Sequence, residues 1–174
     1  MSPFRLVIAL AAGLLAAACD QGGSGRVPQA LEPGPDAIGT ICRMALSEHG
    51  GPKGQVFLNA QDKPLWFSSV RDTFTWLLIE DRPGTGLAAI WVNDMGKSTA
   101  WDKPAAGAWV EARQAVFVVG SDKGAQMGGS EFVPFADRAA AAAFAASHGG
   151  KVMGFGDITR EVLAATEHRE TAHD

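Results

Sequence analysis

Apolar and polar positions follow two patterns along the chain from residue 55 onward, one typical of strands and one typical of helices. Short apolar runs closed by turn residues predict β-strands at 55–58, 64–67, 87–92, 115–119, 131–135 and 151–155. Between them, helical patterns and capping residues predict helices at 70–78, 138–147 and 158–165. In the first of these helices, Val70, Phe74, Leu77 and Leu78 recur at the spacing of one helix face. The pattern predicts an α+β fold.

Polar residues mark the ends of the predicted helices. Either Ser68 or Ser69 can cap the first helix, Asp137 caps the second, and Asp157 caps the third. The second helix closes on a His-Gly-Gly sequence at residues 148–150, which is a typical C-terminal cap.

Two stretches of the chain match when they are laid over each other. In residues 65–71 and in residues 133–139, an apolar strand ending in phenylalanine runs directly into a capped helix. The match predicts an internal duplication, with a first ββαβ unit in residues 38–100 and a second in residues 101–166. The alternative is coincidence between two ordinary segments. Each unit is too small to bury a core well alone, so we expect the two to pack together.

The N-terminus has the features of an export signal. Residues 1–18 combine a basic start with an apolar run and small residues, which is typical of a secretory signal peptide. The sequence Leu-Ala-Ala-Ala-Cys at 15–19 resembles a bacterial lipobox, so Cys19 is predicted to carry lipid. The alternative is an ordinary signal peptide cleaved near Ala18. Residues 19–37 are rich in Gly and Pro and predict a flexible tether, and residues 167–174 form a polar tail.

Composition and charge narrow the class of protein. The 174-residue chain is 47% hydrophobic, enough for a real core and too much for a disordered chain. The formal net charge is −4, and no cluster of Lys and Arg appears. A basic patch is the electrostatic footprint of nucleic-acid binding, so we expect no nucleic-acid partner.

Cys42 is the only cysteine that remains once Cys19 is assigned to the lipid anchor. A free thiol in an exported protein is either buried and inert or kept for chemistry. Met44 and His49 lie within eight residues of it, and the Gly-Gly-Pro sequence at 50–52 predicts a loop that can wrap a ligand. Thiolate and thioether ligands favour Cu(I), whereas structural zinc sites usually gather four Cys or His ligands.

A second methionine adds to this set. Met127 lies in a long glycine-rich connection at residues 120–130, where a methionine has little core to join. Two other interpretations stay open. Cys42 can be a small buried hydrophobic residue in a lipid-anchored interaction domain, or it can pair with His49 as a catalytic nucleophile.

The pattern Cys-x-Met…His-x-Gly-Pro-x-x-Gln, from Cys42 to Gln55, resembles the NosL family of accessory copper-chaperone lipoproteins of nitrous oxide reductase. The later Met-Gly at 127–128, Val-Pro-Phe at 133–135 and His-Gly-Gly at 148–150 are also similar to that family. The resemblance spans residues 38–159 and the lipoprotein signal. One departure is Arg43, where glycine is commoner.

The resemblance implies a Cu(I) chaperone rather than an enzyme, with a fold of two similar ββαβ units. It implies Cys42 and Met44 as primary copper ligands, Met127 as a third and His49 as a fourth. It also implies two partners, nitrous oxide reductase and its ABC-type maturation complex, which builds a copper–sulfide centre. The protein is then held on the periplasmic face of a membrane by palmitate and other acyl chains. The family favours an anchor in the outer membrane, whereas Asp20, directly after Cys19, favours an anchor in the inner membrane. The alternative is a thiol enzyme or a mercury- or sulfur-handling protein acting through Cys42.

Overall fold

The computed structural model describes residues 27–59, 61–79, 86–125 and 127–167 of the chain. The predicted signal peptide, the lipidated Cys19 and all but the first residue of the predicted polar tail lie outside these ranges. Within them, no helix is long and apolar enough to cross a membrane.

The first sheet has four antiparallel strands in the order β2-β1-β3-β4. They are β1 (Gly54–Leu58), β2 (Leu65–Phe67), β3 (Leu87–Asn93) and β4 (Trp109–Glu111). Val56, Ile90 and Val92 point from the central strands into the core and are fully buried. The short apolar runs at 55–58, 64–67 and 87–92 are therefore confirmed as strands.

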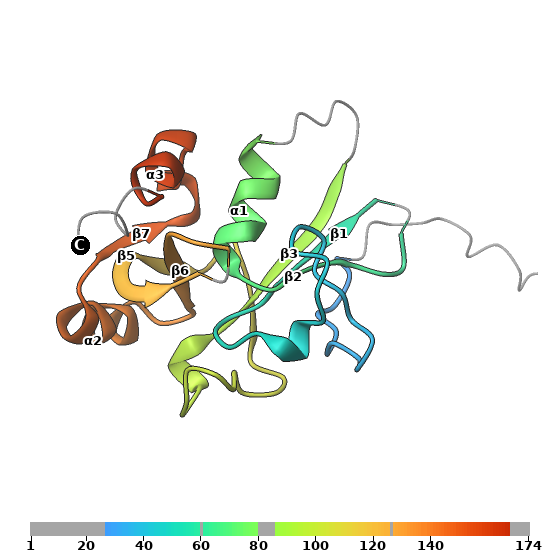
Figure 1. The fold of residues 1–174 in the computed structure, drawn as a ribbon, viewed down its shortest axis with the longest axis horizontal. Coiled ribbons are helices and arrows are strands. Elements are labelled where there is room, and N and C mark those ends of the chain that lie inside the picture. The colour runs from blue at the N-terminus through green and yellow to red at the C-terminus, as the bar shows by residue number, and fades with distance from the viewer. Residues whose placement is uncertain (1–26, 60, 80–85, 126, 168–174) are drawn as a thin grey trace, which may run out of the picture.

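The second sheet has three antiparallel strands in the order β6-β5-β7. They are β5 (Val116–Gly124), β6 (Ser130–Phe135) and β7 (Lys151–Gly154), with α2 (Arg138–His148) between the last two strands and α3 (Arg160–Ala165) after them. Figure 1 shows this unit beside the first sheet, with α1 (Val70–Ile79) between the two. Both units thus have the element order ββαβ, as the sequence predicts, and in both the first strand lies between the second and the third. Descent from a duplicated unit stays a prediction.

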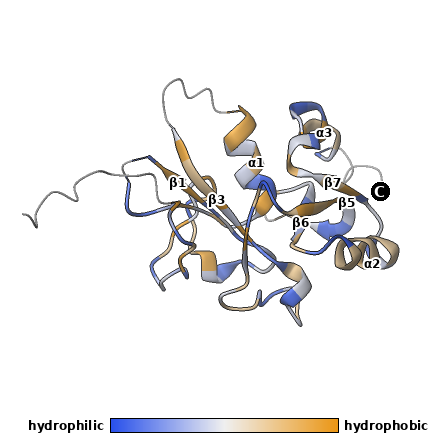
Figure 2. Cartoon of the chain, turned by 180° about the vertical axis from the view of Figure 1, so that it is seen from behind, coloured by the Kyte–Doolittle hydropathy of each residue, from blue (hydrophilic) through white to orange (hydrophobic). Residues whose placement is uncertain are grey.

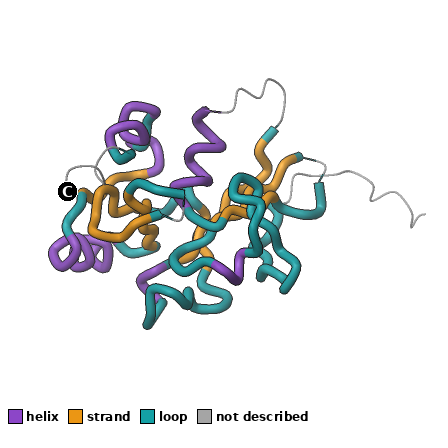
Figure 3. The backbone as a smooth tube through the Cα atoms, in the orientation of Figure 1, coloured by secondary structure: helices purple, strands orange, loops and turns teal. Residues whose placement is uncertain are grey.

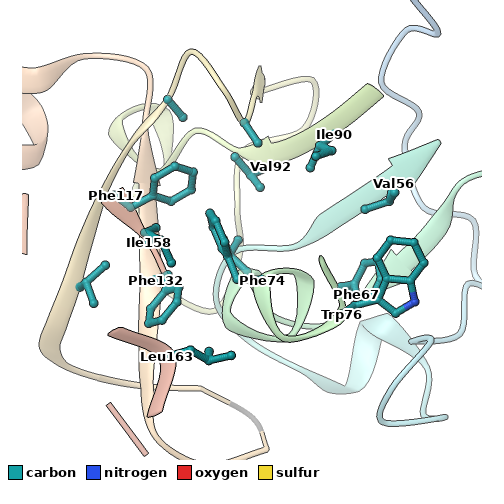
Figure 4. Packing of buried hydrophobic residues seen from close by; sticks show 14 of the residues in the cluster. Val56, Phe67, Phe74, Trp76, Ile90, Val92, Phe117, Phe132, Ile158 and Leu163 are labelled. Atoms are coloured by element: carbon teal, nitrogen blue, oxygen red, sulfur yellow. The ribbon is translucent and has the colours of Figure 1, made fainter. Parts of the chain in front are cut away.

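Helix α1 joins the two units into one core. Phe74 packs against Phe117 and Phe132 of the second unit, with ring centroids 5.1 and 5.7 Å apart. On another face of the helix, Trp76 meets Phe67 of β2 at 5.8 Å. Figure 4 shows these rings filling the space between the sheets, and in Figure 2 the strands of both sheets carry hydrophobic colouring. The expectation that the two units pack together is confirmed.

Several predicted boundaries are corrected by the structure. Strand β5 continues to Gly124 because it pairs again with Ser130 across a register shift, so the connection that holds Met127 is a tight turn. Helix α3 begins after Thr159, whose side chain accepts from the backbone N–H of Val162, and Asp157 lies in a preceding 3-10 turn.

Strand β4 was not predicted from the sequence. It falls in the residues assigned to the second unit, yet it pairs with β3 as the outer strand of the first sheet. The boundary between the units is therefore corrected from residue 100 to the segment between Glu111 and Val116. In Figure 3, long loops lead into and out of the strands of the first sheet. These loops carry the segments from which the candidate site is built.

The predicted tether is also corrected over the part that the structure describes. The backbone N–H and carbonyl of Leu31 pair with the side chain of Gln55, at 2.9 and 3.0 Å. The indole N–H of Trp91 donates to the carbonyl of Pro28, and that of Trp109 to the carboxylate of Glu32. Residues 28–32, which we call the strap, are therefore bound to the outer face of the first sheet.

Candidate metal site

The segment that holds Cys42 folds as a small hairpin between Ile38 and Ala45. These two residues form an antiparallel bridge, and the N–H of Gly39 donates to the carbonyl of Met44 at 2.9 Å. Within the hairpin, the N–H of Arg43 closes a turn onto the carbonyl of Gly39. The hairpin is fastened to the first sheet, because the backbone N–H of Thr40 donates to the carbonyl of Trp66 at 2.7 Å.

Two backbone features shape this hairpin. Arg43 has a φ of 61°, the one positive value among the non-glycine residues that the structure describes. The chain is therefore not extended between Cys42 and Met44. Gly39 lies so close to the sulfur that a Cβ there would be 2.4 Å from Sγ of Cys42. A residue with a side chain at position 39 would displace the thiol.

The thiol of Cys42 is free and only partly exposed. Its sulfur accepts a hydrogen bond from the hydroxyl of Ser68 at 3.3 Å, and it lies 4.0 Å from the carbonyl oxygen of Met44. Ser68 directly precedes Ser69, the residue that caps α1 by accepting from the N–H of Asp72. The sulfur thus lies at the N-terminal end of α1.

The two candidate thioethers are exposed. Met44 has 40% of its surface exposed and Met127 has 55%, the largest fraction of any exposed hydrophobic residue that the structure describes. The turn that carries Met127 is closed by the N–H of Ala125 donating to the carbonyl of Gly129. Gly129 approaches Arg71 so closely that a Cβ there would be 2.7 Å from Nε. Since Arg71 lies in the first turn of α1, the Met127 turn and the Cys42 hairpin flank the same helix end.

His49 lies deeper than the two methionines. The ammonium group of Lys53 donates to the carbonyl oxygens of His49, Gly50 and Gly51, at 2.8 to 2.9 Å, which uses all three of its protons. His49 lines an open pocket of about 270 Å³ together with Lys53, Asn93 and Trp109, and its Nε2 atom is buried. Burial lowers the pKa of Lys53 to about 8. The negative charges of Glu131 and Cys42 act in the opposite direction and raise this pKa.

Buried charges connect this region to the second unit. Glu131 of β6 is 2% exposed, and its carboxylate accepts from the backbone N–H groups of Arg71 and Phe132 at 2.8 Å. Burial raises the pKa of Glu131 to about 8 and also raises the pKa of Asp72. The guanidinium of Arg71 donates to the carbonyl of Leu163 at 3.0 Å. The end of α1 is thus held by both units.

The described part of the chain brings no three His, Cys, Asp or Glu side chains together around one point. A site for a hard or borderline metal is therefore not built here from those residues. What the hairpin and the β5–β6 turn present instead is one thiol and two exposed thioethers, on two segments that flank the N-terminal end of α1. Thiolates and thioethers are the donors that select Cu(I).

Four residues of this region were not identified from the sequence as parts of the site. They are Gly39, Lys53, Ser68 and Glu131. For three of them the sequence gives no sign of a role in a site. They are a glycine three residues before a cysteine, a lysine after Gly-Gly-Pro, and one serine of a pair. An isolated glutamate at the start of an apolar strand was the one available sign, because Glu is almost never fully buried without a partner.

The fold and the site together define a small α+β protein that presents sulfur donors suited to a soft metal ion. Comparison with known proteins gives the family. A family model described as NosL matches residues 30–163, and the chain belongs to the NosL family. The resemblance inferred from the sequence and the α+β fold are therefore confirmed.

The relatives are similar over most of their length. The copper-binding lipoprotein NosL of Achromobacter cycloclastes is 41% identical over 155 residues, covering 88% of this chain and 79% of that protein. Its counterpart in Stutzerimonas stutzeri is 35% identical over 138 residues, covering 77% and 69%. The crystal structure of the copper chaperone NosL from Shewanella denitrificans matches with a TM-score of 0.70 at 33% identity, covering 77% of this chain and 98% of that chain. These relatives are named as copper-binding lipoproteins or as a copper chaperone and not as enzymes, in agreement with the prediction of a non-enzymatic protein.

Proposed function

We propose that this protein is a lipid-anchored Cu(I) carrier on the periplasmic face of a bacterial membrane. It delivers copper for assembly of the copper–sulfide centre of nitrous oxide reductase. The observation that carries this proposal is the free, partly exposed thiol of Cys42 on a hairpin that also presents Met44. The names of the relatives support copper as the metal.

The proposed ligands are Cys42, Met44 and Met127, with His49 as a weaker fourth. One thiolate and two thioethers give a low-coordinate site that suits Cu(I) and that can release it. His49 contributes less, because its Nε2 atom is buried and its carbonyl is bound by Lys53. A carrier needs such an open, exposed site, since the ion must leave with the partner.

The proposed partners are nitrous oxide reductase and its ABC-type maturation complex. Lipid on Cys19 holds the carrier at a membrane, because several acyl chains on one residue bind a membrane firmly. The family supports the outer membrane, whereas Asp20 after the anchor supports the inner membrane.

Anaerobic titration of the reduced mature protein with Cu(I), against a competing chelator, tests the proposal. We expect a dissociation constant below about 1 nM for the wild type. Cys42→Ala should weaken binding by more than about 100-fold, and Met44→Leu or Met127→Leu by about tenfold each, or 1.4 kcal/mol. The matched control is Met153→Leu, because Met153 packs against the core from β7 and should leave the affinity unchanged.

Micromolar or weaker binding that Cys42→Ala does not change would contradict the carrier function. Delivery is tested in cells that make nitrous oxide reductase. There the Cys42→Ala protein should leave the reductase short of its copper–sulfide centre, while Met153→Leu should support a full complement of copper.

A further inference from the structure

Behind the thiol of Cys42 lies the buried hydroxyl of Ser68, which also forms a hydrogen bond with the carboxyl of Asp72 in α1. Ser68 is 1% exposed, and its hydroxyl donates to Sγ of Cys42 at 3.3 Å. The adjacent Ser69 does the work of capping, since its hydroxyl accepts from the N–H of Asp72 and its carbonyl accepts from the N–H of Thr73. Both serines thus contact Asp72 of the helix, but Ser69 caps the backbone of α1, whereas Ser68 also reaches the sulfur.

The surroundings hold Ser68 and Cys42 in this relation. The hairpin is fastened by the bond from the N–H of Thr40 to the carbonyl of Trp66, two residues before Ser68. Gly39 leaves room for the sulfur, because a Cβ there would lie 2.4 Å from Sγ of Cys42 and 3.8 Å from Cβ of Ser68. Since the hairpin and the start of α1 are tied to the same strand, the sulfur meets the hydroxyl in a preformed arrangement rather than by chance.

A hydrogen bond to a metal-bound thiolate has two physical effects. It fixes the direction of the sulfur lone pairs, and it withdraws charge from the sulfur, which tunes the bond to the metal. Bonds to charged acceptors are also stronger than bonds to neutral ones, so the Ser68 bond should strengthen when Cys42 becomes a thiolate.

We propose that Ser68 is a positioning residue for the copper thiolate, donating a hydrogen bond that orients Sγ of Cys42 and sets how tightly the ion is held. This inference rests on the proposed function and adds a residue to it. Ser68 does not touch the metal. It acts through the sulfur, from a buried position.

The test compares Ser68→Ala with Ser69→Ala in the Cu(I) titration. Loss of a group that orients a metal ligand typically costs 10–100-fold in affinity, so we expect Ser68→Ala to bind Cu(I) about tenfold more weakly. Its sulfur-to-copper charge-transfer band in the near ultraviolet should move to lower energy, because the sulfur regains charge. Ser69→Ala should destabilise α1 by about 1 kcal/mol yet keep the wild-type affinity and band.

Ser68→Thr, which keeps a hydroxyl, should retain the wild-type band. This variant and thermal unfolding of each protein separate a lost hydrogen bond from a damaged fold. A wild-type affinity and band in Ser68→Ala would overturn the role of Ser68 alone. Equal losses in Ser68→Ala and Ser69→Ala would overturn it as well, by reducing both to a structural effect. If the wild type and Cys42→Ala bind equally weakly, the proposed carrier function falls and this inference falls with it.

Discussion

Arg43 adopts a backbone conformation that costs an L-residue free energy and costs glycine almost none. Its side chain is exposed, so little packing opposes a replacement. We therefore expect Arg43→Gly to raise the free energy of unfolding by about 0.5–1 kcal/mol. Denaturant unfolding measures this, with Arg43→Ala as the control. Alanine also removes the charge but keeps the strained φ, so an equal gain in both variants would show that backbone strain is not the cause.

The same residue illustrates how far the sequence predicts the site. Cys42 and Met44 could be identified because sulfur donors are few in a chain with two cysteines and five methionines. The positive φ at Arg43 could not be predicted, because arginine has no preference for that backbone conformation. Ser68 could not be separated from Ser69, since which serine caps a helix depends on where the first turn begins. That choice is made by the packing of α1 between two sheets.

At the scale of elements, one buried side chain binds the strap through two hydrogen bonds. Gln55 is fully buried, and its amide takes the place of a neighbouring strand by pairing with both backbone groups of Leu31. In Gln55→Leu these two bonds are lost, at about 1 kcal/mol each. We expect the amide of Leu31 to exchange with deuterium at least about tenfold faster, while the core strands keep their protection.

The matched control for the strap is Trp91→Phe. It removes the single bond to the carbonyl of Pro28 and leaves the Gln55 pair intact. Its effect on exchange at Leu31 should be the smaller of the two. Unchanged exchange in Gln55→Leu would mean that the strap is held by other contacts.

Long elements with a clear pattern were predicted well, and short ones were not. The apolar runs of β1, β3 and β6 and the face of α1 have enough residues to show their rhythm. Strand β4 has only Trp109, Val110 and Glu111, too few to show any alternation. The strap was predicted as free chain because it lies within residues 19–37, whose Gly- and Pro-rich composition resembles a linker. Its bonds come from Gln55, Trp91 and Trp109, which lie far away in the sequence.

At the scale of the whole molecule, the two units are joined through the buried carboxyl of Glu131. Its pKa in the folded protein is about 8, against 4.5 ordinarily, so the folded state holds the proton that the unfolded state releases in this range. The free energy of unfolding should therefore fall as the pH rises from about 4.5 to about 8, by up to about 1.4 kcal/mol per pH unit. The raised pKa of Asp72 acts in the same direction.

Glu131→Gln tests this dependence. Glutamine keeps an oxygen for the N–H groups of Arg71 and Phe132 but cannot ionise. Denaturant unfolding at several pH values should give a flatter profile for the variant than for the wild type. Parallel profiles would show that Glu131 does not set the pH dependence.

The strap also limits how far the protein can reach. From Pro28 onward the chain is bound to the folded body, so only about nine residues separate that point from Cys19. At 3.3–3.6 Å per residue, even a fully extended segment spans roughly 30 Å. With lipid on Cys19, the folded part would stay within this distance of the bilayer. The proposed carrier could then pass copper only to an acceptor whose entry site lies within the same distance.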